Sequence, residues 1–149
     1  IGLPYGRTII LTGFIVMMLW IPLKQKPGFG TIVDLVWIGS VADLIIPNFQ
    51  LSTNTLKSIL LIVFGILFIG IGTAVYVGAG LGVGPRDGIM VGFENKGIKI
   101  GTARVIIELF ALISGWILGG NVGFVTILFV LGIGPIVQLV LPYVDIRNK

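Results

Sequence analysis

The sequence predicts an all-α membrane protein, with a single transmembrane domain over residues 1–149. Three observations support this class. Hydrophobic residues make up 56% of the chain and charged residues only 11%, whereas soluble domains are about 25% charged. Five apolar segments are long enough to cross a bilayer, which takes roughly 17 to 25 residues. A stretch rich in glycine and proline, residues 78–88, follows the third of them.

Polar or helix-breaking residues bound the five predicted transmembrane helices. A basic turn, Lys24 to Gly28, ends the first helix, and Pro47 ends the second. Ser52-Thr53-Asn54 then caps the third helix. The turn Gly119-Gly120-Asn121 separates the fourth from the fifth, which ends at Pro142-Tyr143. The predicted helices cover residues 7–23, 30–47, 57–79, 102–119 and 124–143.

The stretch from Gly78 to Gly88 has a glycine at every second position up to Gly84, followed by Pro85. Irregular backbone is tolerated at membrane depth only where protein or a water-filled cavity satisfies its polar groups. Pro85 suits the first turn of a helix, and Asp87 in that turn would interact favourably with the helix dipole. The stretch therefore predicts a short re-entrant or interfacial helix, of the kind that often marks the binding site of a transporter.

Lysine and arginine are concentrated on one side of this topology. If residues 80–101 do not cross the membrane, eight basic residues lie on one side and two on the other. Because basic residues favour the cytoplasmic side, the C-terminus is expected to be cytoplasmic. The larger group is Lys24, Lys26, Arg86, Lys96, Lys99, Arg104, Arg147 and Lys149, and the smaller is Arg7 and Lys57.

The two ends of the chain resemble each other. Shifted by 95 positions, residues 2–47 align without a gap on residues 97–142, and eleven of the 46 pairs are identical. The identities cluster in Gly-Phe-x-Thr-Ile, at residues 28–32 and 123–127, and around Ile-Gly, at 38–39 and 133–134. Duplication is one interpretation, and convergence of two apolar hairpins is the other. Gln138 occupies the position equivalent to Asp43.

A duplicated unit with three crossings would be inverted in the membrane, as in many transporters. Residues 1–50 would then be the end of a first repeat, and residues 51–149 a second repeat. On this interpretation the counterparts of residues 57–94 precede residue 1, in roughly 40 further residues. The whole protein would have six transmembrane helices and both termini in the cytoplasm.

The candidate binding residues combine the glycine-rich break with ionisable groups inside the predicted helices. Ionisable groups at membrane depth are costly and usually face a cavity or a partner. Each also has a structural interpretation. Arg104 and Glu108 would form an intrahelical pair, Asp34 would pair with Lys24 or Lys26, and Arg86 and Asp87 would pair with each other. The candidates are Gly82, Gly84, Pro85, Arg86, Asp87, Arg104, Glu108 and, more weakly, Asp34.

Composition argues against several classes of function. The chain has no cysteine and no histidine, so we expect no metal site, no cofactor and no enzymatic activity. An intramembrane enzyme would have to depend on carboxylates, of which Asp34 and Glu108 are the deepest. The basic residues lie at helix ends, as topology signals do, so no nucleic-acid partner is expected.

Several motifs resemble a known family. Gly80-Leu81-Gly82-Val83-Gly84-Pro85-Arg86-Asp87-Gly88, Gly115-Trp116-Ile117-Leu118-Gly119-Gly120 and Ile133-Gly134-Pro135 are similar to those of the YczE/YitT-type small bacterial integral membrane proteins. The resemblance covers most of the chain and is strongest over residues 78–142. It implies a multi-pass protein of the bacterial plasma membrane, without an established reaction.

Two functions are compatible with these features. The first is a small-solute transporter or permease of inverted-repeat architecture; Arg86 and the N–H groups of the short helix would favour an anionic solute. The alternative is a non-transporting accessory or scaffold protein that supports a membrane-associated enzyme or complex. The lipid bilayer is a partner in both cases, and a homo-oligomer is compatible with either.

Overall fold

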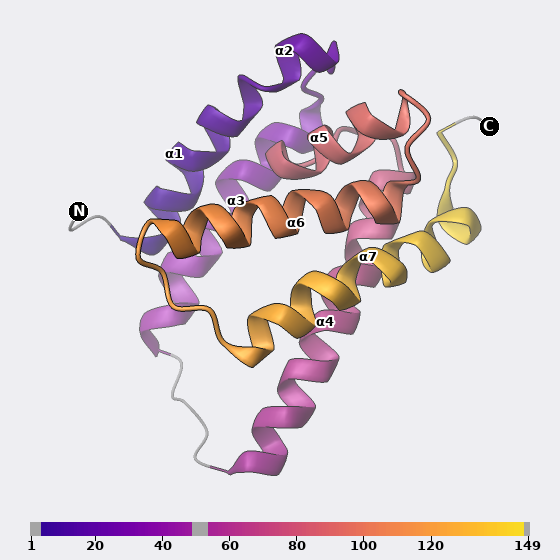
Figure 1. The fold of residues 1–149 in the computed structure, drawn as a ribbon. Helices are drawn as coiled ribbons and strands as arrows, with labels where there is room; N and C mark the ends of the chain where they lie inside the picture. The colour runs from indigo at the N-terminus through magenta and orange to yellow at the C-terminus, as the bar shows by residue number, and fades with distance from the viewer. Residues whose placement is uncertain (1–3, 49–53, 148–149) are drawn as a thin grey trace.

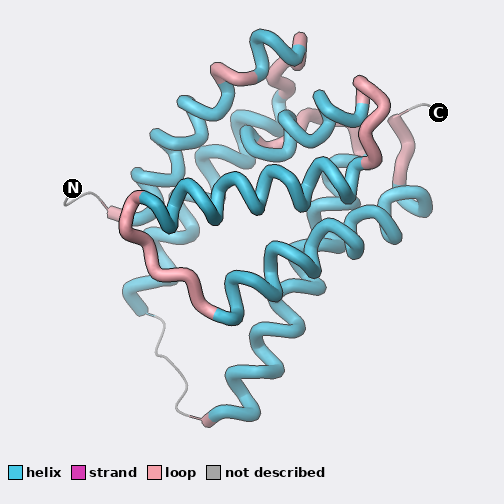
Figure 2. The backbone as a smooth tube through the Cα atoms, viewed as in Figure 1, coloured by secondary structure: helices cyan, strands magenta, loops and turns pink. Residues whose placement is uncertain are grey.

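The computed structural model describes residues 4–48 and 54–147. This part of the chain is helical and contains no β-strand, as Figure 2 shows. The predicted all-α class is therefore confirmed. The helices are α1 (Tyr5–Met17), α2 (Trp20–Leu23), α3 (Phe29–Ile45), the 3-10 helix η1 (Ile46–Asn48), α4 (Thr55–Gly78), α5 (Pro85–Glu94), α6 (Ile100–Ile117) and α7 (Phe124–Val144).

Four of the described helical stretches are long and apolar enough to cross a membrane, where the sequence predicts five. They are Phe29–Asn48, Thr55–Gly78, Ile100–Ile117 and Phe124–Val144. The first predicted helix, residues 7–23, is wrong as a single element, because it divides into the 13-residue α1 and the four-residue α2. Pro22 explains the division. It has no N–H to donate, and its ring crowds the carbonyl four residues earlier, at Met18, where α1 has ended.

The other predicted boundaries agree closely with the structure. The Asn54 side chain caps α4 by accepting a hydrogen bond from Lys57 N at 3.2 Å. Ser52 and Thr53, predicted in the same cap, lie outside the described residues. After α6, Gly119 has φ +91° and Gly120 N donates to Gly115 O at 2.8 Å, which closes the predicted turn. The predicted end of the last helix lies one residue before the end of α7.

Side chains are distributed as lipid requires. The interior contains polar and charged groups, including Thr31, Arg104 and Glu108, all at most 5% exposed. Many large apolar side chains point outward, and Phe68 and Phe110 are more than 70% exposed. Such an apolar exterior suits contact with acyl chains, while small and polar residues serve the contacts between helices.

The helices pair in two hairpins, α1 with α3 and α6 with α7, and α4 lies along α7 (Figure 1). Close approach depends on glycine. A methyl group on Gly6 would overlap the carbonyl oxygen of Gly39, and one on Gly70 would overlap the side chain of Ile136. Gly6 thus lets the backbones of α1 and α3 touch, and Gly70 lets a side chain of α7 pack on the backbone of α4.

The same contacts recur in the two hairpins at a spacing of 95 residues. Gly6 N donates to Asp43 Oδ1 at 2.5 Å, and Gly101 N donates to Gln138 Oε1 at 2.8 Å. Gly6 lies against Gly39, and its counterpart Gly101 lies against Gly134. The matching positions of the two sequence segments therefore make matching hydrogen bonds and backbone contacts.

Helix α5 lies beside α6, with further contacts to α1 and α2. Its beginning lies at the level of Glu108, because Arg86 pairs with that residue. Glu108 is eight residues into α6, so the start of α5 lies about 12 Å along α6, at 1.5 Å per residue. Met90, on the buried side of α5, packs in a core with residues of α4, α6 and α7. The chain thus leaves the end of α4 and continues into α5, which packs against the bundle of longer helices.

Candidate functional site

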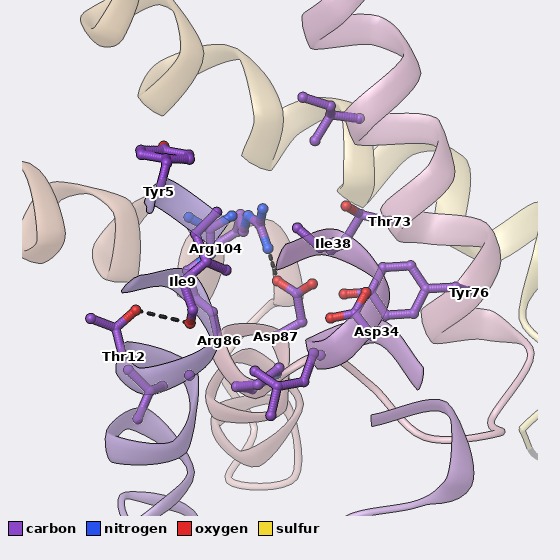
Figure 3. A pocket seen from close by; sticks show the side chains of 16 residues that line it. Tyr5, Ile9, Thr12, Asp34, Ile38, Thr73, Tyr76, Arg86, Asp87 and Arg104 are labelled. Atoms are coloured by element: carbon purple, nitrogen blue, oxygen red, sulfur yellow. Dashed lines mark hydrogen bonds and ion pairs between the residues drawn. The ribbon is translucent and has the colours of Figure 1, made fainter. Parts of the chain in front are cut away.

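A cavity of about 440 Å³ lies among α1, α3, α4 and the start of α5. Aliphatic side chains cover much of its wall, including Ile9, Val16, Leu35 and Ile38. Its polar wall has contributions from α1, α3, α4, α5 and α6, and Figure 3 shows these side chains around the cavity. The polar lining residues are Tyr5, Thr12, Asp34, Thr73, Tyr76, Arg86, Asp87 and Arg104.

Four of the predicted residues form one ion-pair network at the start of α5. Arg104 pairs with Asp87 through Nη1, and its Nε lies 3.2 Å from Glu108 Oε1. Arg86 Nη1 lies 3.3 Å from the same Glu108 oxygen. The Arg104 and Glu108 side chains are 1% and 6% exposed, whereas that of Arg86 is 46% exposed. The network thus has a buried centre and one arginine at its edge.

Pro85 and Trp20 fix the first turn of α5. Pro85 occupies the start of the helix as predicted, and its missing N–H costs nothing there. The indole Nε1 of Trp20 donates to Pro85 O at 2.7 Å. A methyl group on Gly88 would overlap the Trp20 ring, so the ring lies directly on the backbone of α5. Trp20 is therefore a packing residue, and it is 3% exposed.

The glycines before Pro85 form a tight backbone contact with the turn that begins α3. Gly80 and Gly82 have φ of +69° and +115°, values that favour glycine. Gly30 N donates to Leu81 O at 3.0 Å, and a methyl group on Gly82 would meet Gly28 Cα at 2.9 Å. Gly82 is therefore a packing position away from the cavity wall, while Gly84 and Pro85 do line the cavity.

Asp34 and Tyr76 converge on Gly84. A methyl group on Gly84 would overlap Asp34 Oδ2 and would lie 3.6 Å from the Tyr76 hydroxyl. Figure 3 shows the Asp34 carboxyl group beside the Tyr76 ring. The Tyr76 oxygen is buried and has no hydrogen-bond partner within residues 4–48 and 54–147. The missing side chain at Gly84 therefore makes room for the Asp34 carboxylate and for the buried Tyr76 hydroxyl near it.

The structure separates the alternatives for the charged residues. Arg104 and Glu108 do form the predicted intrahelical pair. Arg86 and Asp87 do not pair with each other, because Arg86 pairs with Glu108 and Asp87 with Arg104. Asp34 has no ion pair among the described residues, and its predicted pairing with Lys24 or Lys26 is not seen there.

Thr73 and Tyr76 are lining residues that the sequence analysis missed. Both lie in the last two turns of α4, within a segment interpreted as uniformly apolar. Their spacing of three residues places them on one face of a helix, and this spacing was the available signal. Tyr76 also lies two residues before Gly78, where the break begins.

A second polar cluster holds the C-terminal segment against the end of α5. Arg147 Nη1 lies 2.7 Å from Glu94 Oε2, and Arg147 Nη2 lies 2.7 Å from Asp145 Oδ2. Ile146 N donates to Gly78 O at 3.0 Å. Hydrogen bonds from Arg147 lower the pKa of Asp145 to about 2, and its two carboxylate partners raise the pKa of Arg147.

These features define a multi-span helical membrane protein with a short helix, α5, between two membrane-spanning candidates, and a polar cavity. The chain belongs to the family described as "Family of unknown function (DUF6198)", whose model matches residues 1–142. The resemblance to YczE-type proteins is thereby confirmed.

Two bacterial relatives illustrate the similarity. The chain is 35% identical over 137 residues to an uncharacterized protein of Haemophilus influenzae, and 38% identical over 146 residues to the uncharacterized membrane protein YczE of Bacillus subtilis. These alignments cover 91% and 95% of this chain but only 63% and 66% of the relatives. The chain therefore spans slightly less than two thirds of their length. No solved structure is significantly similar to it.

Proposed function

We propose that this protein is a transporter or permease for a small polar solute, with no enzymatic role. The observation that carries the proposal is the cavity of about 440 Å³, into which the re-entrant α5 brings charged side chains. Charges at membrane depth cost several kcal/mol unless they face a cavity or a partner. A scaffold that only anchors a partner needs no such cavity.

The recurring contacts of the two hairpins support an inverted-repeat architecture. Helix α1 begins near the N-terminus, whereas its counterpart α6 begins at the opposite end of the molecule (Figure 1). The hydrogen bonds from Gly6 to Asp43 and from Gly101 to Gln138 would then be related by a pseudo-two-fold axis in the membrane plane. On this proposal, helices equivalent to α4 and α5 lie outside residues 1–149.

Uptake by the full-length protein in proteoliposomes tests the proposal. A screen of small polar solutes is expected to reveal at least one that accumulates. Arg86→Ala and Glu108→Ala should each lower the initial uptake rate of that solute at least tenfold. Each removes one charge from the ion-pair network beside the cavity. Lys57→Ala, at the exposed start of α4, should leave uptake unchanged. Equal uptake by all four proteins would reject this site.

The accessory or scaffold function is favoured by a different observation. Four lysines are exposed and lie in two loops, between α2 and α3 and between α5 and α6; they are Lys24, Lys26, Lys96 and Lys99. Such a basic surface would attract an acidic partner. Co-purification of one partner in mild detergent, lost on neutralising these lysines, combined with no uptake of any solute, would favour this function over transport.

A further inference from the structure

The charges at the cavity do not balance. Asp34, Asp87 and Arg104 line it together with Arg86, and Glu108 lies directly behind them. Three carboxylates thus face two guanidinium groups. The other lining residues of the described chain are uncharged. With all five groups ionised, the site carries one net negative charge, which favours a cationic ligand over an anionic one.

Both arginines already have carboxylate partners. Arg104 is held between Asp87 and Glu108 and is 1% exposed, so it has no free face for a ligand. Arg86 is half exposed but pairs with Glu108 at 3.3 Å. A ligand anion would have to compete with these carboxylates. The anionic solute expected from Arg86 in the sequence is therefore disfavoured by the pairing.

Asp34 is the carboxylate at the cavity that forms no ion pair among the described residues. Its Oδ2 lies against the backbone at Gly84, and the buried Tyr76 hydroxyl is on the same side. A carboxylate and a phenol oxygen are both acceptors for an ammonium N–H, and an aromatic ring face adds cation–π attraction. A bare metal ion fits less well, since no three acidic side chains among the described residues converge to hold one.

We propose that the cavity binds a small organic cation, a protonated amine with an aliphatic body. The ammonium group pairs with Asp34 and donates a hydrogen bond to Tyr76. The aliphatic body lies against Ile9, Leu35 and Ile38. This proposal names the substrate class of the transport function proposed above and rests on it. It concerns binding, so it is tested without measuring uptake.

Calorimetric titration of the detergent-purified full-length protein provides the test, with n-butylammonium and butyrate as probes of nearly equal size and opposite charge. Titration into empty micelles corrects for partition. Butylammonium is expected to bind and butyrate not to bind. Asp34→Asn should weaken butylammonium binding at least tenfold, because a charged hydrogen bond is lost. Tyr76→Phe should weaken it by a smaller factor.

Asp43→Asn is the matched control, because Asp43 lies outside the cavity and the equivalent position carries the amide Gln138. This variant should bind butylammonium as the unaltered protein does. Gly84→Ala is an independent second variant, since the added methyl group overlaps Asp34 Oδ2 and must displace it. It too should lose at least tenfold in affinity while keeping the helical content of the parent.

Three results would overturn the proposal: no butylammonium binding, tighter binding of butyrate, or equal butylammonium affinity in Asp34→Asn and Asp43→Asn. The transport function and the cation site can be rejected independently of each other. Uptake of an uncharged or anionic solute that depends on Arg86 would keep the transport function and reject the cation site. Asp34-dependent butylammonium binding without uptake of any amine would keep the cation site and reject transport.

Discussion

Arg104 is the most deeply buried charged residue in the described chain, and it holds the carboxylates of Asp87 and Glu108 together. A buried ion pair contributes little net stability against an apolar alternative, but removing one partner costs about 3 to 5 kcal/mol. Replacing any one of these three residues with an uncharged one is therefore expected to destabilise the protein, because it leaves an unpaired charge in the interior.

The sequence predicted which charged residues come together at the cavity better than it predicted their ion-pair partners. The spacing of Arg104 and Glu108 fixes their contact, because residues four apart share a helix face. The partner of Asp87 depends on how α5 packs against α6, which no local pattern specifies. The partner of Asp34 was likewise not predictable from local sequence. The proximity of Asp34 to Lys24 and Lys26 in sequence suggested a pair, yet the carboxylate turns toward Gly84.

The C-terminal cluster gives a pH prediction. Hydrogen bonding to Arg147 lowers the pKa of Asp145 to about 2 from an ordinary value of 3.8. A lowered pKa means that Asp145 stabilises the docked segment fully above pH 4, and that this stabilisation is lost as the pH falls from about 4 to 2. Protection of the Ile146 amide from hydrogen exchange should therefore decrease across this window.

A Glu94→Gln background isolates the effect, because Glu94 is the other carboxylate partner of Arg147. In that background, adding Asp145→Asn should remove the pH dependence between 4 and 2. Identical protection profiles with and without the Asp145 carboxylate would contradict the prediction.

At the scale of elements, α5 is the feature that the sequence predicted most completely. The alternating glycines excluded an ordinary helix, Pro85 marked the first turn, and the segment was too short to cross a membrane. The division of α1 from α2 was not anticipated, although Pro22 signals it. The long apolar run suggested a single continuous helix, and the effect of a proline on the carbonyl four residues earlier outweighed that pattern.

Because α5 packs on the Trp20 ring, adding a methyl group at Gly88 should lower the stability of the protein. Gly88→Ala would overlap the indole ring, which cannot retreat without losing its hydrogen bond to Pro85 O. We expect a loss of about 1 to 3 kcal/mol, the usual cost of overpacking. Thermal unfolding followed by circular dichroism should show a lower midpoint for this variant.

Gly72→Ala provides the matched control, because Gly72 lies inside α4 and an added methyl group would meet nothing within 4 Å. Alanine has the higher helix propensity, so this variant should be as stable as the parent or slightly more stable. A midpoint for Gly88→Ala equal to or above that of Gly72→Ala would show that α5 does not dock tightly on Trp20.

At the scale of the whole molecule, the two hairpins correspond at a spacing of 95 residues in both sequence and contacts. The sequence alone could not exclude convergence, because apolar segments share residues by chance. The structure adds the pairwise hydrogen bonds at Gly6 and Gly101, each to the residue that the alignment predicts. Which side of the membrane each end occupies depends on charge and insertion, and no contact within the chain reports it.

Cysteine labelling tests the predicted orientation, and it is simplified by the absence of cysteine from this sequence. In a full-length protein without other cysteines, Lys96→Cys and Lys57→Cys place one thiol at each end of the molecule. A membrane-impermeant maleimide applied to intact cells should label the cysteine at position 57, and label the one at 96 only after lysis. The reverse pattern would place the C-terminus outside.

Trp20 gives the molecule an internal optical reporter. Trp37 and Trp116 are 68% and 66% exposed, whereas Trp20 is 3% exposed and bonded to the residue where α5 begins. Replacing the two exposed indoles with phenylalanine leaves Trp20 as the remaining tryptophan of residues 1–149, which can be excited selectively over tyrosine. Its emission would then follow the start of α5 in real time, so occupancy of the cavity could be observed without a labelled solute.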